Sequence, residues 1–487
     1  MGYFSGGVRT AVVGVSGRIS LALASGLDMS PQPFVVYDIA ADQRPRWYSD
    51  DIDYLGRVAV GDVDNDGVND AVVAVLFDKA LHFDGGAIKV YRGDHDAFEG
   101  APSQTLHHSP ALAIALGDVD GDGDLDLATG IIATGGSFGD VPPPPPGPVC
   151  VFANDHGRFV ERPVWRSDEN GYVGALTFTD VDQDGRMDLI VAGDRARLYR
   201  GTTAADGSAV LSARSSWQSR ESWQVGYSVA LAPIGRPSRR ALVVSPTCLG
   251  EPCQPAAPVA YYLEKMREPS TPADWTASAV GIGGGIAVAD FDGDGLADLL
   301  AGRIIEELEQ DADPLRFYPG TAGAFASAPT FCTQSTFVAP SLASIPGPSG
   351  AGITIARESF PRSGSGGAVF AVSHAILAVD DVLVDGSRLS RTSFTYEVGG
   401  DAVALSGVAP AAKQVTVAYR WLDRPDVAIA EWRSGQGTGV LSNATRSAAQ
   451  RPAAADAASS ARQRADQPKD RPSSTASASS RTATTGD

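Results

Sequence analysis

The chain has 487 residues, 43% of them hydrophobic, which is enough for one large domain and a smaller module. Its net charge is −19, and this acidity argues against nucleic-acid binding, which needs a basic surface. No run of about 18 apolar residues occurs, so the sequence predicts no membrane-spanning helix.

Four copies of one aspartate pattern follow one another along the chain. They are GDVDNDGVND (61–70), GDVDGDGDLD (117–126), TDVDQDGRMD (179–188) and ADFDGDGLAD (289–298), each with Asp at loop positions 1, 3, 5 and 9 and Gly at position 6. Ca²⁺ takes about six to eight oxygen ligands, and so many carboxylates in one short loop would repel one another without a cation. The glycine allows the unusual backbone angle of a loop that curls around an ion. The pattern predicts four calcium sites.

The EF-hand is another calcium-binding loop rich in aspartate, and the residues in and around the four loops exclude it. An EF-hand needs a bidentate Glu at position 12 and a helix on each side. Position 12 is Val73, Thr129, Val191 or Ala301, and the flanks are short apolar runs such as RVAV and AVVAV. These runs are typical of strands, so each loop is predicted to join two β-strands. The alternative is four solvated acidic turns without metal, and the identical Asp and Gly positions within all four loops disfavour it.

The loops mark an internal repeat. They begin at Asp62, Asp118, Asp180 and Asp290, so the spacings are 56, 62 and 110 residues, the last close to two periods. Degenerate copies without the aspartates are expected at 226–245, 10–26 and 339–357, which makes seven. An apolar, usually aromatic strand follows each copy, at 34–39, 88–93, 149–154, 196–201, 259–264, 315–320 and 368–373.

A third recurring element carries tryptophan, at Trp47, Trp165, Trp223 and Trp275. With it, each period holds about four strands, and radially repeated four-stranded units form a β-propeller. The sequence therefore predicts an all-β fold, with a seven-bladed β-propeller over residues 1–375. The tryptophans are expected in the core, where a large aromatic at a fixed place in each blade packs against its neighbour.

These motifs resemble the FG-GAP repeat of integrin α-subunit propellers and the related VCBS repeats of bacterial surface and secreted proteins. The resemblance covers roughly the first three quarters of the chain. It implies that each loop is the hairpin between the first two strands of a blade, and that carboxylates and one main-chain carbonyl hold Ca²⁺. The implied carboxylate ligands are Asp62, Asp64, Asp66 and Asp70; Asp118, Asp120, Asp122 and Asp126; Asp180, Asp182, Asp184 and Asp188; and Asp290, Asp292, Asp294 and Asp298. The implied carbonyls belong to Val68, Asp124, Arg186 and Leu296.

Two segments follow the repeats. Residues 376–433 contain the alternating runs SFTYEV and QVTVAYRW with Asp-Gly and Gly-Gly turns, which predicts a small antiparallel module similar to a β-sandwich. Residues 434–487 are rich in Ala, Ser and Arg with almost no large apolar side chain, so they are expected to be disordered.

The cysteines and the N-terminus bear on the compartment. Cys248 and Cys253 bracket the tight loop TCLGEPC and are predicted to form a disulfide, as in an oxidising compartment. Cys150 and Cys332 are expected to be buried free thiols. Residues 1–26 lack the pattern of an export signal, whereas weak calcium sites of this type need the calcium concentration found outside cells. An extracellular or cell-surface location is predicted, with the export route and a cytosolic alternative left open.

The ligand surface is predicted from the integrin resemblance alone, on the face opposite the calcium loops. Candidate residues there are Tyr54, Tyr172, Trp223 and Tyr227, because aromatic side chains beside acidic groups suit sugar stacking. The alternative, that these aromatics pack in the blade core, is favoured for the tyrosines.

The six histidines have neither triad nor metal spacing, and GxSxG and HExxH motifs are absent, so the sequence does not indicate an enzyme. The main hypothesis is a calcium-stabilised binding or adhesion protein for a glycan or protein ligand. One alternative is a carbohydrate-active enzyme, such as a polysaccharide lyase or dehydratase, with His82 or Tyr172 beside a basic residue. Another is a structural part of a larger assembly, joined through the C-terminal module.

Overall fold

The computed structural model divides the chain into two units, residues 1–443 and 444–487. The residues that it describes are 8–13, 19–23, 33–38, 45–77, 86–94, 97–108, 111–131, 145–205, 207–248, 254–263, 268–281, 283–303, 315–332, 341–345, 353–361, 369–406, 412–423, 425–430 and 439–441. Most of the predicted disordered tail lies outside these ranges, so that prediction stands untested there. Among the described residues, no helix is long and apolar enough to cross a membrane.

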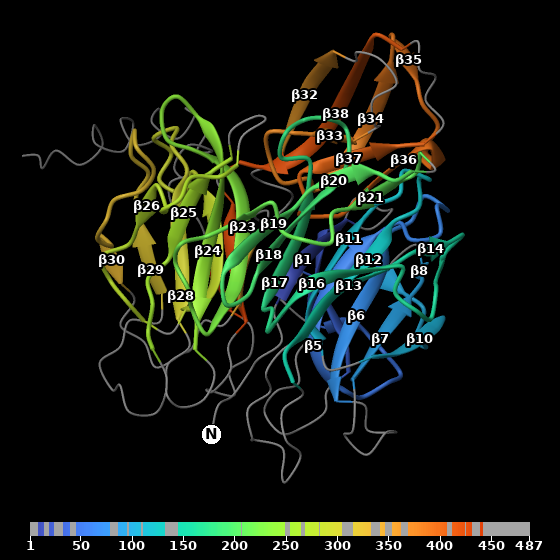
Figure 1. The fold of residues 1–487 in the computed structure, drawn as a ribbon, viewed down its shortest axis with the longest axis horizontal. Coiled ribbons are helices and arrows are strands. Elements are labelled where there is room, and N and C mark those ends of the chain that lie inside the picture. Colours follow the sequence, from blue (N-terminus) through green and yellow to red (C-terminus); the bar gives the residue numbers. More distant parts are fainter. Residues whose placement is uncertain are drawn as a thin grey trace, which may run out of the picture. The chain divides into compact units, whose positions relative to one another are not determined.

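Six four-stranded antiparallel sheets follow one another in the described part of the chain (Figure 1). The first three contain β1 (Val8–Val13), β2 (Ile19–Leu23), β3 (Val35–Asp38) and β4 (Pro45–Tyr48); β5 (Tyr54–Gly61), β6 (Asp70–Phe77), β7 (Gly86–Tyr91) and β10 (Gln104–His108); and β11 (Ala111–Gly117), β12 (Asp126–Ile131), β13 (Gly147–Phe152) and β16 (Trp165–Gly171). The next three contain β17 (Ala175–Thr179), β18 (Asp188–Ala192), β19 (Ala196–Tyr199) and β22 (Trp217–Gln218); β23 (Val225–Ile234), β24 (Arg239–Thr247), β25 (Val259–Tyr262) and β26 (Trp275–Thr276); and β27 (Gly283–Ala289), β28 (Asp298–Arg303), β29 (Leu315–Tyr318) and β30 (Phe331–Cys332).

Three short hairpins form two-stranded sheets of their own after the third strands β7, β13 and β19: β8 (Gly93–Asp94) with β9 (Ala97–Phe98), β14 (Asn154–Asp155) with β15 (Arg158–Phe159), and β20 (Gly201–Thr203) with β21 (Ala209–Leu211). The third strand of each four-stranded sheet falls where the repeat predicts it, from β3 to β29. The degenerate copy at 226–245 forms the β23–β24 hairpin, as expected from its apolar pattern.

The first strand of each sheet contacts the first strand of the next. β1 contacts β5, and the series continues through β11, β17, β23 and β27 to β31 (Ser341–Ile345), which in turn contacts β1. Strands placed side by side in this way would form the inner edges of successive blades, so the arrangement is consistent with propeller blades.

The seventh sheet differs from the prediction. β31 pairs with β39 (Asp426–Ala430), which pairs with β40 (Gly439–Leu441), so strands from the chain's C-terminal part complete it. β40 falls within the segment that was expected to be disordered. The chain between β31 and β39 forms separate sheets, and we call residues 353–422 the insert.

The insert contains two sheets and a short 3₁₀ helix, η3 (Arg391–Ser393). One sheet has the order β32 (Ile353–Pro361), β38 (Gln414–Leu422), β34 (Ala378–Val384) and β35 (Ser387–Arg388). The other has the order β33 (Val369–Ala371), β37 (Ala402–Leu405) and β36 (Phe394–Tyr396). β32 and β33 were assigned to the seventh repeat, and the predicted boundary at residue 375 separates them from their pairing partners. Their apolar residues resemble those of a blade strand, and local pattern does not determine a partner 31–69 residues away.

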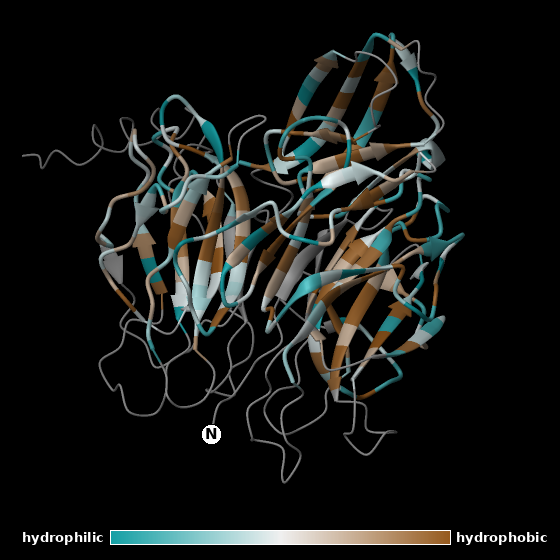
Figure 2. Cartoon of the chain, in the orientation of Figure 1, coloured by the Kyte–Doolittle hydropathy of each residue, from teal (hydrophilic) through white to brown (hydrophobic). Residues whose placement is uncertain are grey.

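Apolar residues concentrate along the strands (Figure 2), and several strands, including β5, β18 and β19, are buried at every position. Buried residues of β5 and β6 also join those of the insert in one cluster, where Val60 and Val73 lie with Tyr396 and Val403. The insert therefore shares its core with the second sheet.

Tryptophan joins neighbouring sheets. Trp165, on the last strand of the third sheet, packs edge-to-face on Tyr199 of the fourth sheet, with ring centroids 5.4 Å apart. The same pairing occurs between Trp47 and Tyr91, Trp217 and Tyr261, and Trp275 and Tyr318. The predicted core role is confirmed for Trp47, Trp165 and Trp275. The fourth repeat uses Trp217 instead of the predicted Trp223, and the shared pattern Trp-x-Ser in 47–49, 165–167 and 217–219 is the signal that distinguishes them.

Candidate metal loops and an adjoining cavity

Each aspartate loop joins the first two strands of a sheet, as the sequence predicts. The loops connect β5 to β6, β11 to β12, β17 to β18 and β27 to β28, and we number them one to four. Each is closed by a strand pair at its base, such as Gly61 with Asp70 and Thr179 with Asp188. The four loops therefore occupy the same place in four sheets.

Each loop turns twice through the left-handed region of backbone conformation. At position 6, φ is +93° at Gly67, +97° at Gly123, +85° at Gly185 and +81° at Gly295. Glycine is required there because a Cβ atom disfavours this conformation. At position 4, φ is positive as well; the residue there is Asn or Gly in loops one, two and four and Gln183 in loop three. The backbone thus curls around the carboxylates at positions 1, 3 and 5.

Backbone N–H groups orient the first and ninth aspartates. In loop one, Gly67 N donates to Asp62 Oδ2 at 2.9 Å, and Val63 N donates to Asp70 Oδ2 at 2.9 Å. Gly93 N, just beyond β7, donates to Asp70 Oδ1 at 2.7 Å, which ties the loop to the third strand. The equivalent bonds recur in the other loops.

Carboxylate oxygens converge in all four loops. In loops one, two and four, one oxygen from each aspartate at positions 1, 3 and 5 lies within 4.8 Å of the others, and in loop three the set is Asp180, Asp182 and Asp188. Asp62 Oδ1 and Asp182 Oδ1 are buried and accept no hydrogen bond from the protein. Buried oxygens without a donor, in an all-carboxylate set, fit a hard divalent cation. The predicted carbonyl ligands at position 7 stay a prediction.

Burial raises the pKa of the ninth aspartate in all four loops and of the first aspartate in loops one, two and three. It raises the pKa of Asp62 to about 6 and that of Asp118 to about 7, and neighbouring aspartates oppose ionisation further. The pKa of Asp126 rises to about 8, again chiefly through burial. A cation in the loop would favour the ionised form, so the protein alone provides a site that is costly to leave without positive charge.

Arginine supplies positive charge in two loops, which the sequence analysis did not foresee. Arg92 Nη1 lies 3.3 Å from Asp64 Oδ2 in loop one, and Arg200 Nη1 lies 3.3 Å from Asp182 Oδ2 in loop three. Both follow the tyrosine that ends a third strand. Loops two and four carry Ala153 and Pro319 at that position. In the sequence, these arginines are marked by the tripeptide Tyr-Arg-Gly, which follows loops one and three at 91–93 and 199–201.

The insert contacts three of the loops. Arg391 Nη2 lies 3.4 Å from Asp62 Oδ2 of loop one, and Val369 N donates to Gly185 O of loop three at 3.1 Å. In loop two, a Cβ atom at Gly123 would lie 2.4 Å from Cβ of Ser406, so the backbone approaches the insert closely. The insert therefore covers the side of these sheets that carries the loops.

The four predicted ligand-face aromatics are mostly buried. Tyr54 is 8% exposed and Tyr227 is 0% exposed, so the core alternative holds for both. Arg57 lies over the Tyr227 ring at 5.2 Å from its centroid. Trp223 is half-buried and packs against the core, and Tyr172 is half-buried. Burial keeps Tyr54 and Tyr227 from contacting a ligand in this conformation, whereas the ligand role of Tyr172 and Trp223 stays a prediction.

The cysteine predictions have a mixed outcome. Cys150 is a buried free thiol, as expected. Cys248 is disulfide-bonded, and its predicted partner Cys253 lies outside the described residues. The side chain of Cys332, like His82 of the enzyme hypothesis, is also outside the part of the chain that the structure describes.

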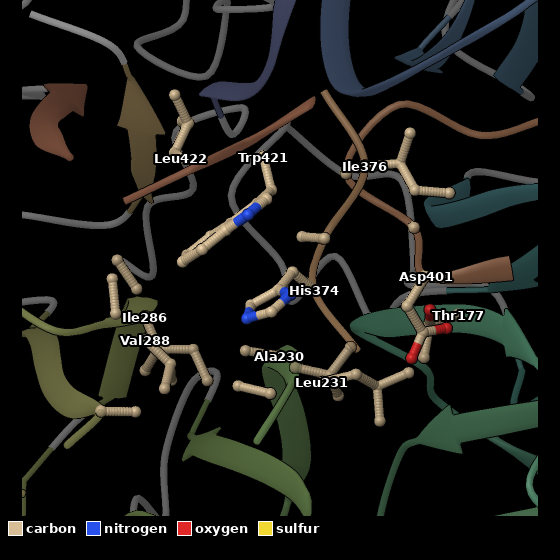
Figure 3. Close-up of a pocket in the computed structure, with 18 of the residues that line it drawn as sticks. Thr177, Ala230, Leu231, Ile286, Val288, His374, Ile376, Asp401, Trp421 and Leu422 are labelled. Carbon is tan, nitrogen blue, oxygen red and sulfur yellow. The ribbon is translucent and has the colours of Figure 1, made fainter. Parts of the chain in front are cut away.

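A cavity of about 530 Å³ lies where first strands of the sheets meet the insert. Its walls come from β5, β17, β23 and β27 on one side and from segments 374–377, 397–401 and 421–423 on the other, and Asp290 of loop four reaches its edge. Figure 3 shows His374 and Trp421 projecting into the cavity, with Ile286 and Val288 across from them. The sequence analysis missed this site because its walls come from distant segments.

Comparison with known proteins identifies the kind of repeat in one part of the chain. A model of the FG-GAP-like repeat matches residues 62–129, which include loops one and two. No curated protein matches the sequence. Among solved structures, the biofilm matrix protein Bap1 of V. cholerae is similar at 13% identity with a TM-score of 0.35, over 88% of this chain and 70% of that chain.

Proposed function

We propose that the chain is a seven-bladed, calcium-stabilised β-propeller that acts outside the cell as a binding protein for a glycan or protein ligand. The observation that carries the proposal is the aspartate loop, which recurs at the same place in four sheets with converging carboxylates. One such cluster could be an acidic turn. Four copies with the same backbone path and the same hydrogen bonds support a common purpose.

The contacts between first strands support a closed ring of seven blades. β31 contacts both β27 and β1, and its sheet is completed by β39 and β40 instead of by the strands that follow it directly. The contact of β31 with β1 brings the last of these sheets beside the first, and such closure is a way to protect sheet edges. In this proposal the insert is a module carried by the seventh blade.

The donor chemistry supports calcium over other cations. The converging ligand atoms in each loop are carboxylate oxygens, and Ca²⁺ accepts such flexible oxygen cages, whereas Mg²⁺ keeps water and demands strict octahedral geometry. The disulfide at Cys248 supports an oxidising, extracellular setting.

Thermal unfolding in calcium and in chelator tests the proposal. A cation that binds only the folded loops stabilises the fold according to its free concentration. We expect the melting temperature to fall by many degrees in chelator and to recover when calcium, but not an equal concentration of magnesium, is restored. Identical melts in calcium and chelator would rule out the metal.

The binding role rests on the scaffold, because rigid sheets that present loops at their ends are suited to recognition. The test is retention of the full chain on an array of glycans, in calcium and in chelator, while cleavage products are monitored. A fragment ending at residue 375 is unsuitable because it lacks β39, the partner of β31. Retention without cleavage supports a binding protein; release of unsaturated sugar products would favour the lyase alternative.

A further inference from the structure

We propose that the cavity between the first strands and the insert binds a neutral, hydroxyl-rich ligand of one or two sugar rings. The inference deepens the proposed function and depends on it only for the class of ligand. The cavity volume, about 530 Å³, is within the range of about 300–1,000 Å³ typical of small-molecule sites.

Two stacked aromatic side chains form a platform in the cavity. The rings of His374 and Trp421 stack with centroids 3.8 Å apart and an interplanar angle of 16°. Both are only partly buried, and they project into the cavity opposite Ile286 and Val288 (Figure 3). A half-exposed aromatic stack facing an apolar wall provides flat surfaces for the CH face of a sugar ring.

Two buried side chains of the cavity have hydrogen-bonding capacity that the protein does not use. Arg57 is 3% exposed, and its Nη2 donates to Gly174 O at 3.1 Å and to Tyr227 O at 2.6 Å, yet its Nε–H has no acceptor in the protein. Asp401 is 4% exposed and pairs with Arg240 through Oδ2, while its Oδ1 has no donor. Both side chains line the cavity. A buried polar group without a hydrogen-bond partner costs free energy of folding. A hydroxyl group of a ligand can bond to either side chain because it both donates and accepts hydrogen bonds.

His374 offers a ring nitrogen for hydrogen bonding to a ligand. Its Nδ1 lies 3.0 Å from the Tyr419 hydroxyl, which donates to Glu358 and therefore accepts from the imidazole. In the neutral ring this leaves Nε2 as an acceptor. A ligand hydroxyl can donate to Nε2 while its ring lies against the Trp421 indole.

Charge narrows the ligand class. Asp290, Glu397, Asp401 and Asp423 line the cavity. Arg240 pairs with Asp401, a bound Ca²⁺ would offset Asp290, and Arg57 is the one arginine or lysine among the lining residues that the structure describes, so Glu397 and Asp423 leave a small acidic surplus. A carboxylate or sulfate group on the ligand would meet this acidic surplus. Neutral saccharides are therefore favoured over uronic acids.

The experiment uses the full chain in calcium, with galactose, N-acetylglucosamine and cellobiose as neutral probes and galacturonate as the acidic counterpart of galactose. Saturation-transfer NMR and calorimetry measure binding. We expect at least one neutral probe to bind, and galacturonate to bind at least tenfold more weakly than galactose if galactose is the one bound. His374→Ala and Trp421→Ala should each weaken binding at least tenfold. Tyr48→Ala, which removes a 53% exposed aromatic away from the cavity, should leave it unchanged.

Thr177→Val provides a milder variant in case the aromatic variants do not fold, because it removes one cavity hydroxyl while keeping the side-chain shape. We expect it to weaken binding about threefold, with an unchanged melting temperature. Wild-type affinity in folded His374→Ala, Trp421→Ala and Thr177→Val proteins would overturn the cavity site while leaving a saccharide-binding function elsewhere on the molecule. Failure of the wild-type chain to bind any saccharide or array glycan would overturn both.

Discussion

Arg92 Nη1 lies 3.0 Å from Asp70 Oδ2, so a side-chain cation stands within the first aspartate loop. Arg200 Nη1 has the matching position in loop three, 3.1 Å from Asp188 Oδ2. Loops two and four have no arginine at this position. The four loops therefore form two classes, one partly neutralised by arginine and one made of carboxylates alone.

Replacing Arg92 and Arg200 by alanine is expected to strengthen calcium binding at loops one and three by about tenfold or more. The guanidinium repels a divalent cation nearby and occupies the same carboxylates, an effect on the order of a few kcal/mol at an effective dielectric constant of about 20. Calorimetric calcium titration of wild type and variant measures the change. In chelator the same variant should melt lower, because it loses two ion pairs per loop.

The reciprocal substitution is the control. Ala153→Arg places an arginine at the equivalent position of loop two and should weaken calcium binding at that loop. Arg214→Ala removes an 84% exposed arginine from an ion pair outside the loops and should leave the calcium affinities unchanged. Equal affinities in all four loops, unaffected by either exchange, would contradict the two classes.

Asp120→Ala should lower the melting temperature by less than chelation does. Asp120 belongs to the carboxylate set of loop two and is exposed, so its loss damages one site and disturbs little packing. In chelator the variant and the wild type should melt within about a degree or two of each other, since an exposed side chain contributes little by itself. Differential scanning calorimetry provides the comparison; a large deficit in chelator would show that Asp120 acts through the fold.

Trp217→Ala should destabilise the fold by about 3–5 kcal/mol, the usual range for a buried large aromatic. Trp217 is 7% exposed, its ring centroid lies 5.2 Å from that of Tyr261, and its Nε1 donates to Thr271 Oγ1 at 2.9 Å. Trp223→Ala is the matched control and should cost less than half as much. Urea unfolding in saturating calcium measures both; a larger cost at Trp223 would reverse the assignment.

His374 should make stability depend on pH. Burial lowers its pKa from 6.5, with Glu358 and Asp423 opposing the shift. The unfolded chain therefore binds a proton before the folded protein does, so this contribution is complete above pH 6.5 and is lost as the pH falls through the lowered value. The difference in unfolding free energy between wild type and His374→Phe, measured from pH 8 to pH 5, should shrink as the pH falls. A constant difference would mean that His374 titrates normally.

Features with a local cause could be predicted from the sequence, and features made by distant pairing could not. The Asp and Gly positions of each loop determine its path, and the apolar runs on both sides determine the strands, so loops and third strands fell in the right places. The pairing of β31 with β39 depends on residues far apart in the chain, and AVFAVS looked like a blade strand although it pairs with β37. The cavity was missed for the same reason, since His374 and Asp401 meet Arg57 and Thr177 only in the folded chain.

The late pairing of β31 has a consequence for synthesis on the ribosome. Ser341 pairs with Ala430, so one edge of β31 lacks its pairing partner until 89 further residues have been synthesised. During that interval six sheets can already form, while the nascent seventh presents unpaired backbone N–H and C=O groups that other chains could capture. The insert, whose strands pair among themselves, emerges before β39 and can shield neighbouring apolar surface. Truncations that stop short of residue 430 should therefore aggregate instead of merely losing a terminal extension.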